Sequence, residues 1–454
     1  MRTRTAGRLG LAVAAALLLA PALALAGEPL VLPSKIDVPL GARLTSLLGM
    51  VVIMVLAWAA STNRRVVQWR VVIWGVGLQL ALGAVLLQTD VGAGFFGALK
   101  DGVAKLLQFY REGANLLFDP LMSTTEEMGR IPFAFSVLPT IIFFSSLMAV
   151  LYHLRIMQLV VGAVARVMQW TLRTSGAESL SAAGNIFVGQ TEAPLLIRPF
   201  VEKMTDSELM AVMTGGFATV AGGVMVAYVG MFGDLFPDMA GHLMTASIMS
   251  APAALVIAKL MLPETGTPET AGTVAKGERS TYQNTIDAAA TGAADGLTLA
   301  LNVAAMLLAF VALVALLNAL LTVVGGWVGV EELTFQRILG WVLAPLAWVM
   351  GVPWDDAQAV GSLLGTKTVL NEFYAYFELS SLVQTGAIRD PRSVIIATYA
   401  LCGFANFGSI AIQIGGIGAI APNRRKDLAR IGLRAMIGGT LAAFMTATVA
   451  GMML

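Results

Sequence analysis

Two carboxylates, Glu192 and Glu372, stand in stretches that are otherwise built of glycine, amide and apolar residues. A carboxylate at membrane depth costs at least about 2.5 kcal/mol and is normally kept there for function. Gln190 and Thr191 precede Glu192 and add an amide and a hydroxyl, so this group can hydrogen-bond to the edge of a planar polar ring. The simpler alternative is that both carboxylates face water at the mouth of a hairpin.

A second polar group surrounds Glu372. Asn371 precedes it, and Asn406 and Ser409 lie three residues apart, on one face of a helix. Such an acceptor-rich set suits vicinal hydroxyls, and a base edge together with a sugar makes a nucleoside. The residue types alone equally allow an amino acid, a sugar or a dicarboxylate. Phe404 could stack on such a ligand, although an aromatic residue in a membrane helix more often only packs.

The composition indicates the class of protein to which these residues belong. Of 454 residues, 57% are apolar and 13% are charged, which excludes an ordinary soluble protein. The formal net charge is +1 with no basic block, so a nucleic-acid partner is disfavoured. A single cysteine, Cys402, excludes an internal disulfide, and the two histidines, His153 and His242, stand in no zinc-binding motif. The sequence predicts an all-α polytopic membrane protein embedded in a lipid bilayer.

Eight apolar runs are long enough, at about 17 to 25 residues, to cross a hydrocarbon core of ~30 Å as helices. The predicted spans are 44–60, 71–88, 131–152, 209–232, 243–262, 297–322, 394–420 and 435–454. Between them, residues 92–118 alternate apolar and charged side chains, which is typical of a helix lying in the membrane interface.

The amino terminus has the pattern of a signal peptide at 1–26, with three early arginines, an apolar run and Ala24-Leu25-Ala26 before the predicted cleavage site. An uncleaved first membrane helix is the alternative. With the mature chain starting outside, three basic loops fall on one side, as the positive-inside rule requires. Both termini are then periplasmic, and the absence of disulfides agrees with a bacterial inner membrane protein.

Two segments, 174–200 and 355–383, carry carboxylates, amides and glycines at what must be membrane depth. Such backbone survives there only if it is buried in protein or lines a wet cavity. Each is followed by a helix with a similar start, at Phe217-Ala218-Thr219 and at Phe404-Ala405-Asn406. The two segments enter from opposite sides of the membrane, which indicates an inverted-repeat transporter with its site near the midplane.

The predicted organisation after the signal peptide has four parts. These are scaffold helices and the interfacial helix at 27–130, a first repeat at 131–262 with its re-entrant hairpin, a cytoplasmic loop at 263–296, and a scaffold helix with the second repeat at 297–454.

Three motifs narrow the choice of ligand. GNIFVGQTEAPL at 184–195 and GTKTVLNEFYAY at 365–376 closely resemble the two signature motifs of the concentrative nucleoside transporter family, and CGFANFGS at 402–409 is similar to a third. The resemblance covers roughly residues 35–450. It implies two re-entrant hairpins, a homotrimer of eight-helix protomers and elevator-type nucleoside import, with no enzyme activity and no cofactor besides sodium as the coupling ion.

The resemblance also assigns roles to individual residues. The nucleobase contacts are Gln190, Thr191, Glu192 and Val224, and the ribose contacts are Glu372, Asn406 and Ser409 with Phe404 beside them. The sodium ligands are the side chains of Asn185 and Thr219 and the backbone carbonyls of Val188 and Val220. Oxygen ligands of this kind suit a hard cation. Thr219 could instead serve only in helix packing.

Four alternatives or departures accompany this assignment. Gly408 stands where the family pattern has a hydroxyl residue, so one ribose or water contact is expected to be missing. Sodium is favoured because the Gln-Thr-Glu-Ala-Pro form is kept, while proton coupling through Glu372 is the alternative. The same architecture could also carry another small polar solute. An intramembrane enzyme with Glu192 and Glu372 as acid and base is disfavoured, since no nucleophile, histidine or metal set accompanies them.

Overall fold

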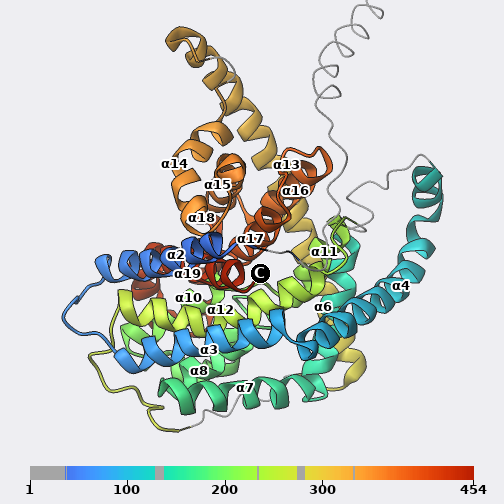
Figure 1. Cartoon of the computed structure of the whole chain (residues 1–454). Coiled ribbons are helices and arrows are strands. Elements are labelled where there is room, and N and C mark those ends of the chain that lie inside the picture. Colours follow the sequence, from blue (N-terminus) through green and yellow to red (C-terminus); the bar gives the residue numbers. More distant parts are fainter. Residues whose placement is uncertain (1–35, 37, 128–137, 233–234, 274–281, 331–332) are drawn as a thin grey trace, which may run out of the picture.

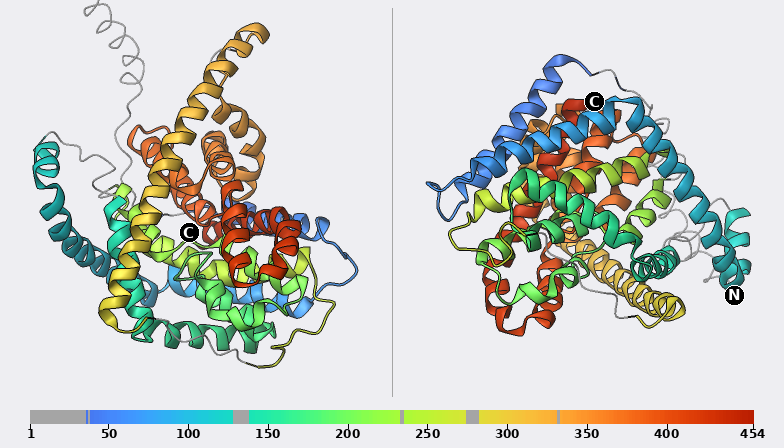
Figure 2. Two further views of the ribbon diagram at one scale, coloured as in Figure 1. Left: turned by 180° about the vertical axis from the view of Figure 1, so that it is seen from behind. Right: turned by 90° about the horizontal axis from the view of Figure 1, so that it is seen from below.

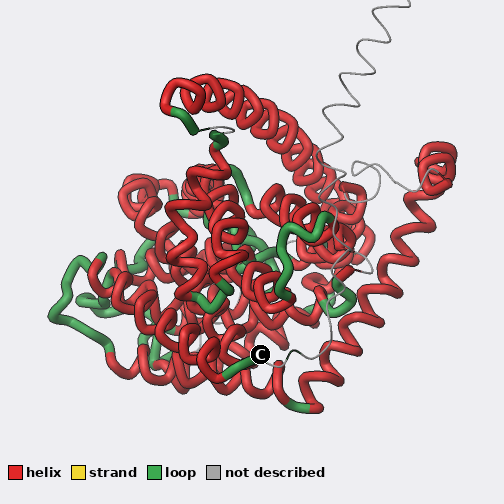
Figure 3. Tube along the Cα trace, turned by 45° about the horizontal axis from the view of Figure 1, so that its top comes forward, coloured by secondary structure: helices red, strands yellow, loops and turns green. Residues whose placement is uncertain are grey.

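The computed structural model describes residues 36, 38–127, 138–232, 235–273, 282–330 and 333–454. The predicted signal peptide at 1–26 lies outside these residues. Every regular element in the described part of the chain is a helix (Figure 3), which confirms the predicted all-α fold class.

The helices divide between two halves of the chain. The first half holds α2 (Leu40–Ala59), α3 (Trp69–Gln88), α4 (Asp90–Glu127), α6 (Leu138–His153), α7 (Ile156–Leu172), α8 (Gly176–Gly184), η1 (Ala193–Ile197), α9 (Arg198–Val201), α10 (Asp206–Ala218), α11 (Gly222–Phe232) and α12 (Met239–Met261). The second half holds α13 (Thr285–Val328), α14 (Phe335–Val349), α15 (Trp354–Val369), α16 (Glu372–Gln384), α17 (Pro391–Leu401), α18 (Phe407–Ile420), η3 (Pro422–Arg424) and α19 (Arg425–Met453).

By length and composition, six spans among the described residues could cross a membrane, and up to eight if each of two bent helix pairs counts as one span. The bent pairs are α6 with α7, at 76°, and α14 with α15, at 117°. This agrees with the prediction of about eight membrane helices. Hydropathy alone did not predict α14, because its 15 residues, interrupted by Pro345, are shorter than the run needed to cross the bilayer.

Helix α7 lies between the predicted span 131–152 and the predicted hairpin 174–200, where the sequence suggested only one of the three basic loops. Its buried residues include Met157, Val161, Ala165 and Met168, which recur every three or four positions and form one apolar stripe. Arg166 lies on the same helix, so part of the positive charge counted as a loop is carried by an amphipathic helix.

Two helices are longer than the sequence suggested. The interfacial helix expected at 92–118 is part of α4, a single helix of 38 residues that leads away from the body (Figure 1). The span expected at 297–322 is part of α13, a helix of 44 residues whose far end stands clear of the body (Figure 2). The exposed side chains of α13 include Leu301, Leu308 and Trp327, a surface suited to lipid or to another protein rather than to water.

The centre of the molecule is formed by α10, α12 and α19, which pack on one another and bury most of their residues. Alanine is frequent on the buried faces of α12 and α19. Small residues let helix backbones approach closely, which is how membrane helices gain van der Waals contact when lipid is as apolar as their side chains.

Two of the predicted spans are broken near their middle. The run 209–232 forms α10 and α11 with a break at residues 219–221, and the run 394–420 forms α17 and α18 with a break at residues 402–406. The breaks lie at the two similar segments noted in the sequence, Phe217-Ala218-Thr219 and Phe404-Ala405-Asn406. They place non-helical backbone in the interior of the protein.

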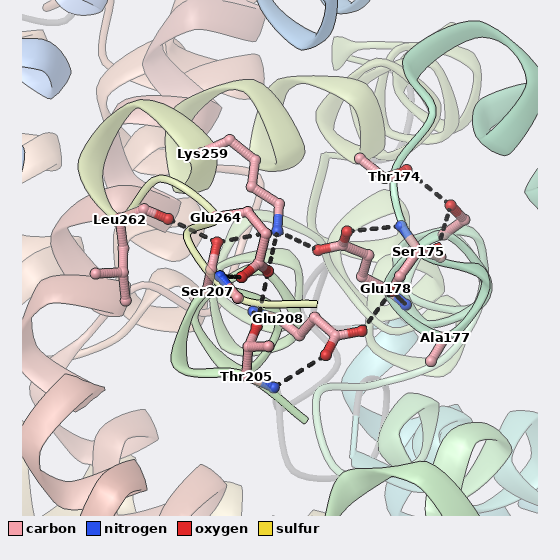
Figure 4. A network of polar contacts seen from close by, with 12 residues as sticks. Thr174, Ser175, Ala177, Glu178, Thr205, Ser207, Glu208, Lys259, Leu262 and Glu264 are labelled. Carbon is pink, nitrogen blue, oxygen red and sulfur yellow. Dashed lines mark hydrogen bonds and ion pairs between the residues drawn. The ribbon is translucent and has the colours of Figure 1, made fainter. Parts of the chain in front are cut away.

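A buried ion pair fastens the start of α8 to the end of α12 (Figure 4). Lys259 Nζ lies 2.7 Å from Glu178 Oε2, with both side chains only 2% exposed, and 3.5 Å from Glu264 Oε2. The same ammonium donates to Ser207 Oγ at 3.0 Å on α10. Three segments that are distant in the sequence therefore meet at one cation.

Two helix caps extend this network. The Ser175 hydroxyl accepts from the Glu178 backbone N–H at the start of α8, and the Thr205 hydroxyl accepts from the Glu208 N–H at the start of α10. Ser175 Oγ also donates to Glu208 Oε1 at 2.6 Å, so the two capping boxes are joined. The starts of α8 and α10 are fixed to each other by polar groups that are themselves buried.

We expect Lys259→Met to lower the free energy of unfolding by about 3–5 kcal/mol, because it leaves Glu178 as a buried carboxylate without its cation. The matched control is Lys203→Met, which removes an exposed pair with Glu269 and should cost no more than about 1 kcal/mol. Thermal unfolding of the purified proteins in detergent measures both. Equal stability of the two variants would contradict the structural role of Lys259.

Candidate functional site

Two helical hairpins carry the polar segments at their tips. The first is formed by α8 and by η1 with α9, and its tip holds Asn185, Gln190 and Glu192. The second is formed by α15 and α16, and Asn371 and Glu372 lie where one helix ends and the next begins. The polar residues singled out in these two segments therefore stand at the hairpin tips, in turns or at the first residue of a helix.

Asparagine caps fix the starts of the helices that carry the second group. Asn371 Oδ1 accepts from the Tyr374 N–H at 2.8 Å, which starts α16 with Glu372 as its first residue. A carboxylate is favoured there by the positive end of the helix dipole. Asn406 caps α18 in the same way, its Oδ1 accepting from the Ser409 N–H at 2.9 Å.

The Glu372 carboxylate is buried and accepts two hydrogen bonds. Asn406 Nδ2 donates to Glu372 Oε2 at 3.0 Å, and the Tyr228 hydroxyl donates to Glu372 Oε1 at 3.2 Å. The structure thus brings together Glu372 and Asn406, as the sequence suggested. It adds Tyr228 of α11, which is fully buried and stacks on Tyr376 with 4.3 Å between ring centroids. A tyrosine in an apolar run is the only signal that the sequence offers for it, since a buried hydroxyl needs a partner.

Gln190 reaches α18 on the other side of the site. Its Nε2 donates to Ser409 Oγ at 3.1 Å, and its Oε1 accepts from Gln413 Nε2 at 3.0 Å. Ser409 is therefore linked to Gln190 through its side chain and to Asn406 through its backbone. A continuous chain of hydrogen bonds runs from the tip of one hairpin to the tip of the other.

The remaining residues assigned to the ligand surround this chain. Thr191 packs on α18, where a Cβ at Gly416 would lie 2.8 Å from its Cγ2. Glu192 is exposed and its carboxylate folds back over Gly189, so it stays outside the chain of hydrogen bonds between the tips. Val224 is buried near the start of α11, and Phe404 is partly buried in the break before α18.

The two broken helices touch at Gly403. This residue has φ +130°, and a Cβ there would lie 2.6 Å from the Phe217 carbonyl oxygen and 2.8 Å from the Ala218 carbonyl carbon. Only glycine fits, both for its backbone conformation and for the approach of the other chain segment. The second break therefore lies against the last residues of α10, directly before the first break.

The side chain of Asn185 is buried in the first hairpin, and neither atom of its amide has a hydrogen-bond partner among the described residues. It lies close to α10, where a Cβ at Gly215 would be 3.1 Å from its Nδ2. The hydroxyl of Thr219 donates to the Gly215 carbonyl at 3.0 Å. Burying an amide without a partner is costly. A cation bound at the Asn185 side-chain oxygen would give that oxygen a partner.

A backbone hydrogen bond joins the two segments that contain these atoms. The Gly222 N–H, at the end of the first break, donates to the Phe187 carbonyl at 3.0 Å in the hairpin tip. Val188 follows directly in the tip, and Val220 lies in the break. The four residues assigned to sodium thus come from two stretches that are tied together.

Three family models match the chain. They are described as Na+ dependent nucleoside transporter N-terminus, over residues 48–121, as nucleoside recognition, over residues 134–235, and as Na+ dependent nucleoside transporter C-terminus, over residues 242–451.

Relatives of known sequence are similar over most of the chain. An uncharacterized transporter of Haemophilus influenzae is 45% identical over 418 residues, 90% of this chain and 97% of the relative. Sodium/nucleoside cotransporter 1 of Mus musculus is 44% identical over 426 residues, again 90% of this chain, which spans 64% of the length of that protein.

Solved structures are also similar. CNTnw in an inward-facing substrate-bound state matches with a TM-score of 0.84 and 45% identity, covering 91% of this chain and 98% of that one. A CNTnw double variant in an outward-facing state matches with a TM-score of 0.84 and 44% identity, covering 90% and 97%.

We expect Gly403→Ala to lower the free energy of unfolding by about 3 kcal/mol or more, because its methyl group would combine a strained φ with a clash against backbone. Gly415→Ala is the matched control on α18, since a Cβ there meets nothing within 4 Å and alanine favours a helix by up to about 1 kcal/mol. Thermal unfolding in detergent compares the two. If both variants unfold at the wild-type temperature, Gly403 is not in contact with the end of α10.

Proposed function

Because the chain belongs to the sodium-dependent, concentrative nucleoside transporter family, whose members are membrane transporters and not enzymes, we propose that it imports nucleosides by symport with sodium. The observation that carries this proposal is the chain of hydrogen bonds between the two hairpin tips. It runs from Glu372 through Asn406 and Ser409 to Gln190. All four side chains are buried, with a carboxylate at one end of the chain of hydrogen bonds and an amide at the other.

The two ends of this chain of hydrogen bonds match the ribose and the base of a nucleoside. In the proposal, Glu372, Asn406 and Ser409 hold the ribose hydroxyls with Phe404 beside them, because a carboxylate offers only acceptors to hydroxyl donors. The base lies toward the amide end, where Gln190 both donates and accepts. The other proposed base contacts are Thr191, Glu192 and Val224. Glu192 is exposed in this structure and so has the freedom to turn toward a ligand.

Sodium is the proposed coupling ion. Its proposed ligands are the side-chain oxygens of Asn185 and Thr219 and the backbone carbonyls of Val188 and Val220. The unpartnered amide of Asn185 supports this assignment. The alternative is proton coupling through Glu372, a carboxylate buried between the hairpins.

We propose that transport is of the elevator type in a homotrimer of the bacterial inner membrane, with both termini periplasmic. The hairpins and broken helices are joined by hydrogen bonds and by the Gly403 contact, so they are suited to move as one unit. In this proposal the scaffold is formed by 27–130 and by the helix that opens 297–454, and the moving unit lies in 131–262 and the rest of 297–454. The predicted loop 263–296, whose last residues belong to α13 in the structure, is then cytoplasmic.

The proposal is tested by uptake of radiolabelled uridine into proteoliposomes with an inward sodium gradient. We expect concentrative uptake that Thr219→Ala shifts to about five- to tenfold higher sodium, because the variant removes one oxygen ligand from the ion. Thr398→Ala is the matched control: its buried hydroxyl also donates to a carbonyl four residues earlier, at 2.8 Å, on α17 of the other half.

Other outcomes separate the alternatives. Uptake that does not depend on sodium but requires a proton gradient would support the nucleoside substrate and show that the coupling ion is a proton. Absence of uridine uptake under either gradient would contradict nucleoside transport, and a competition panel with amino acids and sugars would then show which polar solute is carried.

We expect Glu372→Gln to reduce uridine uptake at least about tenfold, because an amide presents a donor where the ribose hydroxyls need an acceptor. The fold should tolerate the change, since the Tyr228 hydroxyl can turn to accept from the new amide while Asn406 continues to donate to its oxygen. Glu378→Gln changes a carboxylate on the same helix, away from this group, and serves as the control. Wild-type affinity for uridine in Glu372→Gln would rule out the ribose assignment.

A further inference from the structure

Gln413 has no role in the proposed function, yet it is fully buried beside the amide end of the site. It lies on α18 one turn after Ser409. Its Nε2 donates to the Gln190 side chain at 3.0 Å and to the Met213 backbone carbonyl of α10 at 3.1 Å. Both of its amide hydrogens are therefore engaged, one by the backbone of α10 and one by a residue of the site.

The Met213 contact decides which way the Gln413 amide points. A backbone carbonyl only accepts hydrogen bonds, so the atom of Gln413 that faces it must be the nitrogen. The second hydrogen of that nitrogen then points at Gln190, and the atom that receives it must be the Gln190 oxygen. Gln190 in turn is left with its nitrogen toward Ser409, at 3.1 Å.

The packing is adapted to this contact. A Cβ at Gly216 of α10 would lie 2.9 Å from Gln190 Cβ and 2.9 Å from Gln413 Nε2. A larger residue at 216 would push the two glutamines away from the carbonyl that orients them. The hairpin tip and α18 can therefore pack against α10 only because residue 216 is a glycine.

Gln413 is not explained as a residue that merely fills space. Its Oε1 is buried and has no hydrogen-bond partner among the described residues. An apolar side chain would avoid the cost of burying that oxygen. The donor half of the amide is the part that makes contacts, and both contacts concern the orientation of Gln190.

We propose that Gln413 is a positioning residue for nucleobase selection: it locks the Gln190 amide so that its N–H donors, and not its carbonyl, face the ligand. This inference rests on the proposed function, in which Gln190 contacts the base. A base that presents a carbonyl to those donors is accepted, and one that presents an amino group at the same place meets another donor. Without Gln413, the Gln190 amide can rotate by half a turn and present either its N–H donors to an oxo base or its carbonyl to an amino base.

The test compares oxo and amino bases in proteoliposome uptake. The measured quantities are the apparent affinities for uridine and cytidine, which differ in a carbonyl or an amino group, and for inosine and adenosine, which differ likewise. Gln413→Leu should lower the ratio of the apparent affinities for the oxo and the amino nucleoside by about fivefold or more, toward a ratio of one. This change corresponds to the free energy of one hydrogen bond. The ratio of uridine to 2′-deoxyuridine, which reports the ribose contacts, should stay within about twofold of the wild type.

A double-variant cycle shows whether Gln413 acts through Gln190. In the Gln190→Ala background, Gln413→Leu should change the oxo to amino ratio no further. If the change persists there, Gln413 acts on the base by another route and the inference is wrong. An unchanged ratio in Gln413→Leu, or an equal loss for every nucleoside and deoxynucleoside, would overturn it too.

Gln79 provides a matched control. It is also fully buried, its Nε2 also donates to a backbone carbonyl, of Met249 at 3.0 Å, and to a side chain, and its Oε1 also lacks a partner among the described residues. Gln79→Leu should change thermal stability about as much as Gln413→Leu and leave the base ratios unchanged. If Gln413→Leu does not fold, Gln413→Met, with an unbranched apolar side chain of similar length, takes its place.

Failure of this inference is distinct from failure of the proposed function. A wild type that transports no nucleoside overturns the proposed function. A wild type that transports nucleosides but does not distinguish oxo from amino bases leaves that function standing and overturns the role of Gln413.

Discussion

One constraint governs the whole arrangement: backbone polar groups in a non-helical stretch at membrane depth need partners within the protein. The first break meets it through the neighbouring hairpin, where the Gly222 N–H donates to the Phe187 carbonyl. The second break meets it with its own side chain, since Asn406 caps α18 at Ser409. Gly403 of the second break then packs against the end of α10, directly before the first break. The hairpin tips are consequently not independent of the breaks. The contacts that provide partners for the backbone of the breaks also position the site that tips and breaks form together.

The two halves of the chain hold each other's hairpins. The first tip is bound by α18 of the second half, through Gln190 and Ser409, and the second tip is bound by α11 of the first half, through Tyr228 and Glu372. On the proposed function this exchange gives a physical basis for coupling. Asn185, the proposed ion ligand, belongs to the same short tip as Gln190, so an ion that orders the tip also orders the amide that meets the base.

The sequence predicted the parts of the site in which residue type and local spacing decide. The spacing of three between Asn406 and Ser409 paired these two residues correctly, although Asn406 caps α18 and does not lie on its face. A carboxylate in an apolar chain is conspicuous, so the second polar group could be predicted. Tyr228 and Gln413 could not, because each is a single polar residue in an apolar helix and its importance arises only from segments far away in the chain. The breaks in 209–232 and 394–420 were hidden for a similar reason: hydropathy continues across them, and only the opposite backbone shows why helix stops there. The ligand roles carried over from the family remain predictions.

The first hairpin is fastened differently at its two ends, and this difference matters for binding. At its base, Glu178 is held by Lys259 in a buried ion pair, which is expensive to break because either partner alone would be an unpaired buried charge. At its tip, Gln190 is held by Ser409 and Gln413 through hydrogen bonds between neutral groups. Neutral hydrogen bonds exchange at little net cost when a new polar partner arrives. A ligand can therefore take the place of Ser409 on Gln190 while the base of the hairpin keeps its position and Gln413 keeps the amide oriented.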